Sequence, residues 1–102
     1  MIECICIDDS NKPKEIPARK WIKKDKKYHI IFTTTAMPQK ILAVELSEIC
    51  LDESCNPYEY FDAKRFGLTY ENLIKLNELI KNCSDIDFSI DELMKQTELV
   101  EQ

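Results

Sequence analysis

Four lysines surround one aspartate in the segment WIKKDKKYHI, which covers residues 21–30. Lys23, Lys24, Lys26 and Lys27 could neutralise phosphates of a nucleic acid, and Trp21 or Tyr28 beside them could stack on a base. The purely structural interpretation is a solvated turn, in which lysines keep an exposed strand end soluble. The segment lacks the glycines that let phosphate-binding loops approach an anion closely. We therefore expect a turn that is basic mainly for solubility, with nucleic-acid binding by residues 19–27 as the alternative.

A second candidate site is the aromatic segment NPYEYFDAKRF. Tyr58, Tyr60, Phe61 and Phe66 fall within nine residues of one another. If Tyr58 or Tyr60 is exposed, it forms with Trp21 an aromatic patch of the composition found at protein-binding surfaces. The alternative is that these rings fill the interior. The candidate partner-binding residues are Trp21, Lys23, Lys24, Lys26, Lys27, Tyr58 and Tyr60.

The remaining reactive side chains do not form a catalytic or metal-binding pattern. Residues two apart on a strand, such as Cys4 and Cys6, are separated by about 6.8 Å, whereas two thiolates on one zinc ion lie about 3.8 Å apart. His29 is the only histidine, and no neighbouring cysteine could pair with it as a nucleophile. We therefore predict no metal, no cofactor and no enzymatic activity.

Length and composition describe one small folded domain. The chain has 102 residues, of which 44% are hydrophobic and 32% charged, which excludes the low-hydrophobicity signature of disorder. No apolar run approaches the roughly 20 residues that a membrane span needs. The first residues, MIECICIDDS, lack the basic flank of a signal peptide, and the five cysteines are odd in number. These features predict a cytoplasmic protein with reduced thiols and no membrane association.

Charge is distributed unevenly along the chain. Residues 1–40 carry a net charge of +4 and residues 41–102 a net charge of −9, which gives −5 for the whole. An asymmetry of this size is typical of a protein with an electrostatic face. The negative total opposes nonspecific binding to nucleic acid, so a protein partner is the preferred expectation.

Short apolar and alternating segments predict the strands that position these residues. The run IECICI at residues 2–7 is typical of a buried strand. Residues 28–35 and 40–49 alternate, and they predict a hairpin with a loop of about four residues, AMPQ, at residues 36–39. We expect the inward-facing residues to be Tyr28, Ile30, Phe32, Leu42, Val44 and Leu46. A helical turn near residues 57–61 and a short closing strand in AKRFGL complete the β part.

The period changes to that of a helix after Gly67. Thr69 is a suitable N-cap, and the leucines that follow predict a helix over residues 70–81. Ser89 and Glu92 form a capping box, which predicts a second helix over residues 89–100. The apolar stripes of these helices need cover, either from the β part or from a second copy of the chain. A homodimer through the C-terminal helices is therefore one expectation for assembly.

The segments CIDDSNKP, KWIKKDKKYHI, LAVELSEI and PYEYFDAKRF together resemble a group of small uncharacterised proteins from Bacteroidetes-type bacteria and their phages. The resemblance covers residues 2–67 and concerns scaffold positions. It implies a small barrel of the Src-homology-3-like kind and a role linked to phages or mobile elements, and it carries no assigned activity. Asp25 stands where the basic turn of this group has glycine, and aspartate tolerates the left-handed conformation that such a turn needs.

The sequence thus predicts a mainly β protein with a C-terminal α part. We expect a five-stranded Src-homology-3-like antiparallel β-barrel in residues 1–67, followed by a helical extension in residues 68–102 that packs on the barrel or on a partner. The expected function is that of a noncatalytic interaction module that binds a protein. The alternative is a nucleic-acid-associated accessory protein that uses the basic turn.

Overall fold

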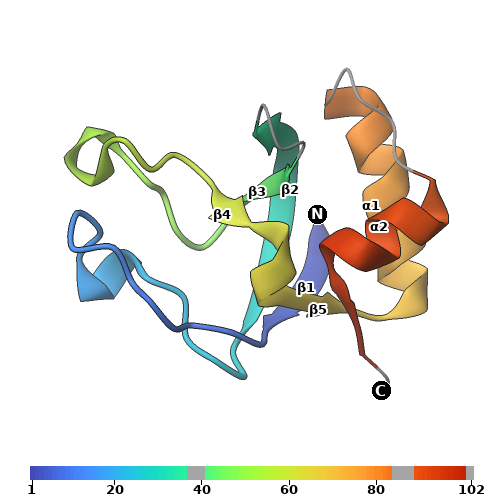
Figure 1. Cartoon of the computed structure of the whole chain (residues 1–102), viewed down its shortest axis with the longest axis horizontal. Helices are drawn as coiled ribbons and strands as arrows, with labels where there is room; N and C mark the ends of the chain where they lie inside the picture. Colours follow the sequence, from blue (N-terminus) through green and yellow to red (C-terminus); the bar gives the residue numbers. More distant parts are fainter. Residues whose placement is uncertain (37–40, 84–88, 101–102) are drawn as a thin grey trace.

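The computed structural model describes residues 1–36, 41–83 and 89–100. The elements in chain order are β1 (Ile2–Cys6), η1 (Ala18–Lys20), β2 (Lys27–Ala36), β3 (Ile41–Leu46), η2 (Glu53–Cys55), β4 (Phe61–Asp62), η3 (Ala63–Arg65), β5 (Phe66–Leu68), α1 (Tyr70–Cys83), α2 (Ile90–Gln96) and β6 (Glu98–Leu99), where η marks a 3₁₀ turn. The two α-helices lie on one side of the strands, and two long loops extend on the opposite side (Figure 1).

Within the described residues, six strands form one sheet in the order β4-β3-β2-β1-β5-β6. Neighbouring strands are antiparallel except β5 and β6, which run parallel. The sheet is open, because β4 and β6 form its two edges instead of pairing with each other. The coarse prediction of a β sheet followed by helical structure is confirmed, whereas the predicted five-stranded barrel is not what the chain forms. Edge strands of two residues offer too few pairing groups to close a sheet of this size.

A β-bulge in β2 decides which residues face the core. Ile30 pairs with Leu46, but Phe32 pairs with Glu45, so β2 carries one extra residue against β3. Because side chains alternate along a strand, the extra residue reverses the faces beyond it. Five of the six predicted inward residues are buried, namely Tyr28, Ile30, Leu42, Val44 and Leu46. The prediction for Phe32 is wrong, since it is only half-buried and Thr33 takes the inward position.

Helix α1 completes the core against the sheet. Its residues Leu73, Leu76 and Ile80 are fully buried in the same cluster as the inward residues of β1, β2 and β3. The Thr69 hydroxyl accepts a hydrogen bond from the Asn72 N–H at 3.3 Å, as expected for an N-cap. The predicted helix over residues 70–81 is confirmed and extends to Cys83. The apolar face of α1 is therefore covered within the chain.

The second predicted helix is shorter than expected and is followed by a strand. Ser89 and Glu92 form the predicted capping box, but α2 ends at Gln96. Thr97 is extended, and its hydroxyl donates to the Leu93 carbonyl at 3.0 Å, which stops the helix. Residues Glu98–Leu99 then pair with β5 as β6, so the helix prediction is wrong for residues 97–100.

Two local predictions in the 53–68 region are also corrected. The 3₁₀ turn lies at Glu53–Cys55 instead of residues 57–61. The closing segment AKRFGL divides into the turn η3 and the strand β5, which pairs with β1. Ala36, the first residue of the predicted loop at 36–39, instead ends β2, and residues 37–39 lie outside the described residues.

Candidate functional site

A pocket of about 190 Å³ lies between the two long loops, which cover residues 7–26 and 47–60. The residues that line it come from the first loop, from the second loop, and from β4 and η3. They are Pro13, Ile16, Trp21, Tyr58, Tyr60, Phe61, Asp62 and Arg65. We call this the loop pocket. It brings together Trp21, Tyr58 and Tyr60, the three aromatic residues that the sequence proposed as a partner-binding patch.

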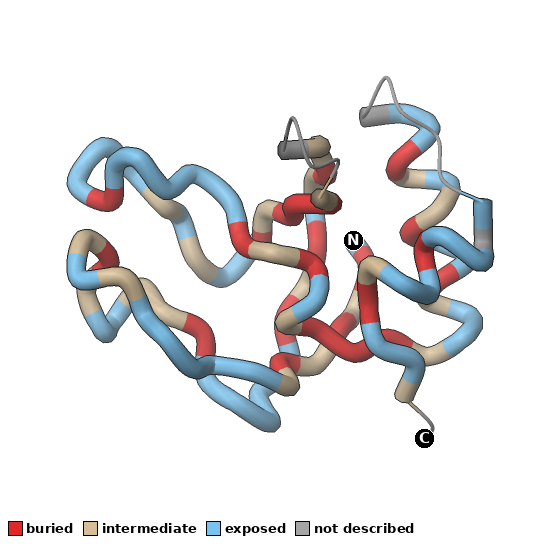
Figure 2. Tube along the Cα trace, in the orientation of Figure 1, coloured by how far each residue is buried: buried red, intermediate tan, exposed pale blue. Residues whose placement is uncertain are grey.

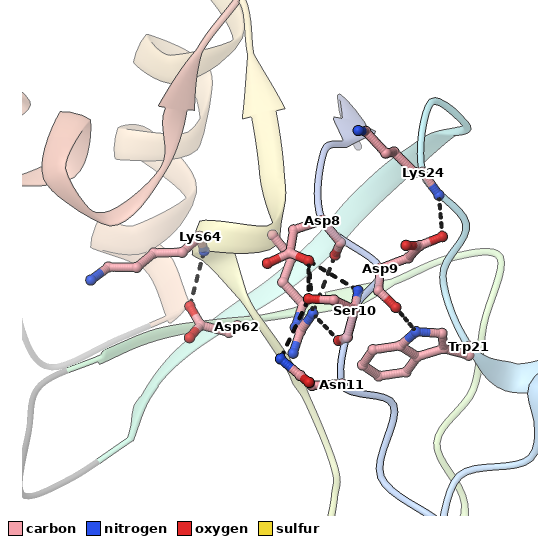
Figure 3. A network of polar contacts seen from close by, with 9 residues as sticks. Asp8, Asp9, Ser10, Asn11, Trp21, Lys24, Asp62 and Lys64 are labelled. Atoms are coloured by element: carbon pink, nitrogen blue, oxygen red, sulfur yellow. Dashed lines mark hydrogen bonds and ion pairs between the residues drawn. The ribbon is translucent and has the colours of Figure 1, made fainter.

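Trp21 is held on three sides. Its indole N–H donates to the Asp9 carbonyl at 2.7 Å, as Figure 3 shows. Its ring lies 5.8 Å from the ring of Phe61, and the Arg65 guanidinium lies 5.0 Å from its centroid on a cation–π contact. Contacts of this number fix the rotamer of the indole before any partner arrives.

The two tyrosines are the exposed part of the loop pocket. Tyr58 and Tyr60 keep 39% and 37% of their surface accessible, so both rings are available to a partner. Tyr60 stacks on Phe32, with the ring centroids 6.2 Å apart. The bulge in β2 is what turns Phe32 to this side of the sheet, and so the deviation from regular alternation supports the pocket wall.

Polar contacts, instead of apolar burial, tie the loops together. Lys20 of the first loop forms an ion pair with Asp52 of the second. This hydrogen bond from Lys20, with further ones from Ser54, lowers the pKa of Asp52 to about 2. Lys12 donates to the Ile16 carbonyl at 2.6 Å, which closes the first loop on itself.

Arg65 links η3 to the start of the first loop. Its Nη1 donates to the carbonyl oxygens of Ser10 at 2.8 Å and Asp8 at 3.3 Å, and it lies 3.7 Å from the Asp8 carboxylate. Hydrogen bonds from Ser10, with a smaller contribution from the Arg65 charge, lower the pKa of Asp8. The sequence did not single out Arg65 or Asp62, because their place in the pocket depends on how the two loops dock.

The basic turn lies apart from the loop pocket, next to acidic groups. The Lys24 N–H donates to the Asp9 carboxylate at 3.0 Å (Figure 3). Lys26 lies 5.6 Å from the centroid of the Tyr28 ring, and Lys27 pairs with Glu3 at 3.5 Å. The side chain of Lys23 is not among those that line the loop pocket. The four lysines therefore do not join Trp21, Tyr58 and Tyr60 in one site.

The left-handed residue predicted for the basic turn is present. Asp25 has a φ of 70°, in the region that favours glycine and that aspartate tolerates. Its N–H donates to the Cys6 carbonyl at 2.8 Å, so the turn is fastened to the end of β1.

Cys4, Cys6 and His29 occupy structural positions. Cys4 and Cys6 are buried free thiols, and burial raises the pKa of Cys4 to about 12 and raises that of Cys6. Within residues 1–36, 41–83 and 89–100, no cluster of three His, Cys, Asp or Glu side chains is arranged to hold a metal ion. The Glu48 carboxylate binds both the N–H and the Nδ1 of His29, at 2.8 and 2.6 Å.

A larger groove of about 560 Å³ lies beside β1 and β5. Its lining includes Ile5, Ile7, Gly67 and Val100, and no sequence pattern indicated this groove. Gly67 is the only glycine of the chain, and its φ is not positive. A Cβ atom there would lie 2.5 Å from Val100 Cγ1, so glycine is needed for the close approach of Val100 and not for a turn.

Comparison of the chain with protein-family models, with curated proteins and with solved structures finds no significant match. No helix in the described part of the chain has the length and apolar character needed to cross a membrane.

Proposed function

We propose that this chain is a noncatalytic interaction module that binds a protein partner through the loop pocket. The observation that carries this proposal is the meeting of Trp21, Tyr58 and Tyr60, from two loops that are distant in sequence, around one pocket. Partly exposed aromatic rings at a concave site are the usual anchors of a protein interface. The free thiols of the described cysteines further support a reducing compartment, which we propose to be the cytoplasm.

The size of the pocket supports a protein partner over a small molecule. Sites for small ligands usually enclose about 300–1,000 Å³. The loop pocket, with about 190 Å³, matches one inserted side chain. The fixed positions of Trp21 and Tyr60 lower the entropy that a partner loses on binding, because few of the contacting side chains need to be ordered.

The surroundings of the basic turn favour this proposal over nucleic-acid binding. The Asp9 carboxylate accepts a hydrogen bond from the Lys24 N–H, and the Glu3 carboxylate pairs with the Lys27 side chain. Both negative charges weaken the positive potential of the basic turn. Of the two rings beside the turn that could stack a base, Tyr28 is buried, and Trp21 lines the loop pocket, apart from the lysine side chains of the turn.

A selection from a displayed library of random peptides tests the proposal. The intact protein serves as bait, and a Tyr58→Ala/Tyr60→Ala variant serves as the counter-bait. We expect enriched peptides that shift the amide NMR signals of residues around the loop pocket and that bind the double variant at least tenfold more weakly. Tyr70→Ala is the matched control, because Tyr70 is an equally available tyrosine, 54% exposed, on α1.

Two outcomes would contradict the proposal. One is that no peptide is enriched over the double variant. The other is binding of DNA or RNA at micromolar or tighter dissociation constants in physiological salt, with a steep salt dependence that Lys24→Glu/Lys26→Glu abolishes. The second outcome would establish the basic turn as the site.

A further inference from the structure

One polar side chain stands out in the otherwise aromatic wall of the loop pocket. Asp62 lines the pocket beside Tyr60 and Phe61. One of its carboxylate oxygens accepts the Lys64 N–H at 2.9 Å, at the start of η3 (Figure 3). Among the described residues, no lysine, arginine or histidine forms an ion pair with Asp62. A half-buried carboxylate therefore faces the pocket with its charge uncompensated by a neighbouring cation.

The positive group that also lines the pocket is already engaged. Arg65 is neutralised by Asp8, donates to two carbonyl oxygens, and covers the Trp21 ring. This contact demonstrates that the aromatic wall accepts a guanidinium on a ring face. The Tyr58 and Tyr60 rings remain partly exposed, and they stand next to Asp62 in the chain and in the pocket.

The wall that carries the tyrosines is acidic. Residues 47–63 contain five acidic residues and no lysine or arginine. Two of the five are matched, since Lys20 pairs with Asp52 and His29 contacts Glu48. Glu53 and Glu59 are exposed in the same segment without lining the pocket, and they add to its negative charge, whereas Asp62 lines the pocket itself.

We propose that the loop pocket receives one cationic side chain of the partner, a lysine or arginine or its N-methylated form. This inference rests on the proposed function and names the chemistry of the bound group. The cation would lie over the faces of Tyr58 and Tyr60, within the roughly 6 Å at which a ring quadrupole attracts it. Asp62 would supply the opposing charge. The volume of about 190 Å³ holds one such side chain.

The opposite wall limits how many positive charges the partner can present. Lys12 and Lys20 of the first loop are tied to carbonyl and carboxylate oxygens, but Lys14 and Arg19 are exposed. A polybasic segment would meet repulsion from these two residues. A single basic residue next to neutral or acidic ones fits both walls. An anionic side chain is disfavoured because Arg65 Nη1 already donates to two carbonyl oxygens.

NMR titration with four blocked tripeptides, Gly-X-Gly, tests the proposal. X is lysine, trimethyllysine, glutamate or norleucine, where norleucine keeps the alkyl chain of lysine without the ammonium group. We expect lysine and trimethyllysine to shift the amide signals of Tyr58, Tyr60 and Asp62. Norleucine and glutamate should bind at least tenfold more weakly, because neither brings a positive charge to the rings.

Two variants separate the contributions of charge and rings. Asp62→Asn keeps an oxygen that can accept the Lys64 N–H, and it should weaken lysine binding at least fivefold. Tyr58→Leu keeps an apolar side chain without a ring quadrupole and should weaken it by a similar factor. Asp91→Asn, at an exposed aspartate of α2, is the matched control and should leave binding unchanged.

Three results would overturn the cationic pocket. They are norleucine binding as well as lysine, glutamate binding best, and no tripeptide binding at the pocket. Failure of the proposed function is measured separately, by the absence of library peptides that depend on Tyr58 and Tyr60. Enriched peptides without a required basic residue would leave the interaction module standing and remove only the cation as its ligand.

Discussion

The helix side and the loop side of this molecule are stabilised by different forces. On the helix side, Leu73, Leu76, Ile80 and Leu93 are fully buried against the sheet. On the loop side, exposed and half-buried residues predominate, with isolated buried positions such as Ile16 (Figure 2). The two loops are joined by the Lys20–Asp52 ion pair, and the first loop is joined to η3 by Arg65, instead of by a continuous apolar layer.

This difference lets stability and the proposed partner binding reside on different sides of one small chain. Apolar burial of about 25 cal/mol per Å² stabilises the helix side and requires no particular partner. The loop side keeps aromatic surface accessible, which costs hydrophobic stabilisation but leaves rings available for recognition. Free energy of unfolding should therefore depend on residues of the helix side, and binding on residues of the loop side.

The largest effect is expected from Val44→Asp, which tests the shared sheet. Val44 is fully buried in β3 and lies in the core cluster with Leu73 and Leu76. An unpaired carboxylate at this position costs several kcal/mol, which is comparable to the whole stability of a small domain. We expect loss of the cooperative melt in circular dichroism. A Val44→Asp protein that melts like the parent would contradict the alternation of β3.

A direct comparison of the two sides comes next. Leu76→Ala should lower the free energy of unfolding by about 2–5 kcal/mol, because a fully buried leucine leaves a cavity. Tyr58→Ala removes a side chain that is 39% exposed and lies outside the core cluster, so it should destabilise the protein less than Leu76→Ala does, while weakening peptide binding. Denaturant melts and peptide titrations on both variants measure the four values. Similar destabilisation by both would remove the distinction between the sides.

Gly67→Ala tests whether β6 belongs to the stable part. The new methyl group would lie 2.5 Å from Val100 Cγ1, so overpacking should cost about 1–3 kcal/mol. Val100→Ala removes the clashing atom. In the double variant Gly67→Ala/Val100→Ala, the alanine at 67 should therefore cost less than it does alone, which a double-mutant cycle measures. Equal costs in both backgrounds would mean that Val100 does not pack on Gly67.

Local patterns predicted the parts of the fold that local forces decide. The apolar alternation of β3 and the capping box of α2 were both readable, because each depends on residues close in sequence. The bulge at Ile31 was not, since a single inserted residue leaves no trace in a run of β-branched and aromatic side chains. The strand β6 was missed because Glu98 continues the polar face of the helix before it, and only the pairing with β5 distinguishes it.

The candidate site was predictable in composition but not in assembly. Trp21, Tyr58 and Tyr60 were chosen by type, and the structure places all three in one pocket. Asp62 and Arg65 were not singled out, because their roles arise when the first loop docks on η3 through Asp8 and Ser10. Contacts between distant loops have no sequence period to reveal them. The prediction of a closed barrel was wrong for the same reason, since closure depends on which strands occupy the edges of the sheet.

The smallest effect is expected from the ion pair that joins the two loops. Lys20 and Ser54 hold the pKa of Asp52 at about 2, below its ordinary value of 3.8. Because the folded-state pKa is lowered, the link is fully formed above about pH 4 and is lost as the pH falls through about 2. NMR titration of the Ser54 amide, whose N–H donates to Asp52 at 3.0 Å, should report this midpoint.

Lys20→Met keeps the aliphatic chain and should raise the midpoint part of the way toward 3.8, because the bonds from Ser54 remain. Lys81→Met, at an exposed lysine of α1, is the control and should not move it. The melting temperature at neutral pH should stay unchanged in both variants, since the pair is solvent-exposed and such pairs contribute little. A midpoint that Lys20→Met leaves unchanged would mean that Lys20 does not hold the two loops together, and that docking of Trp21 and Arg65 alone keeps the pocket formed.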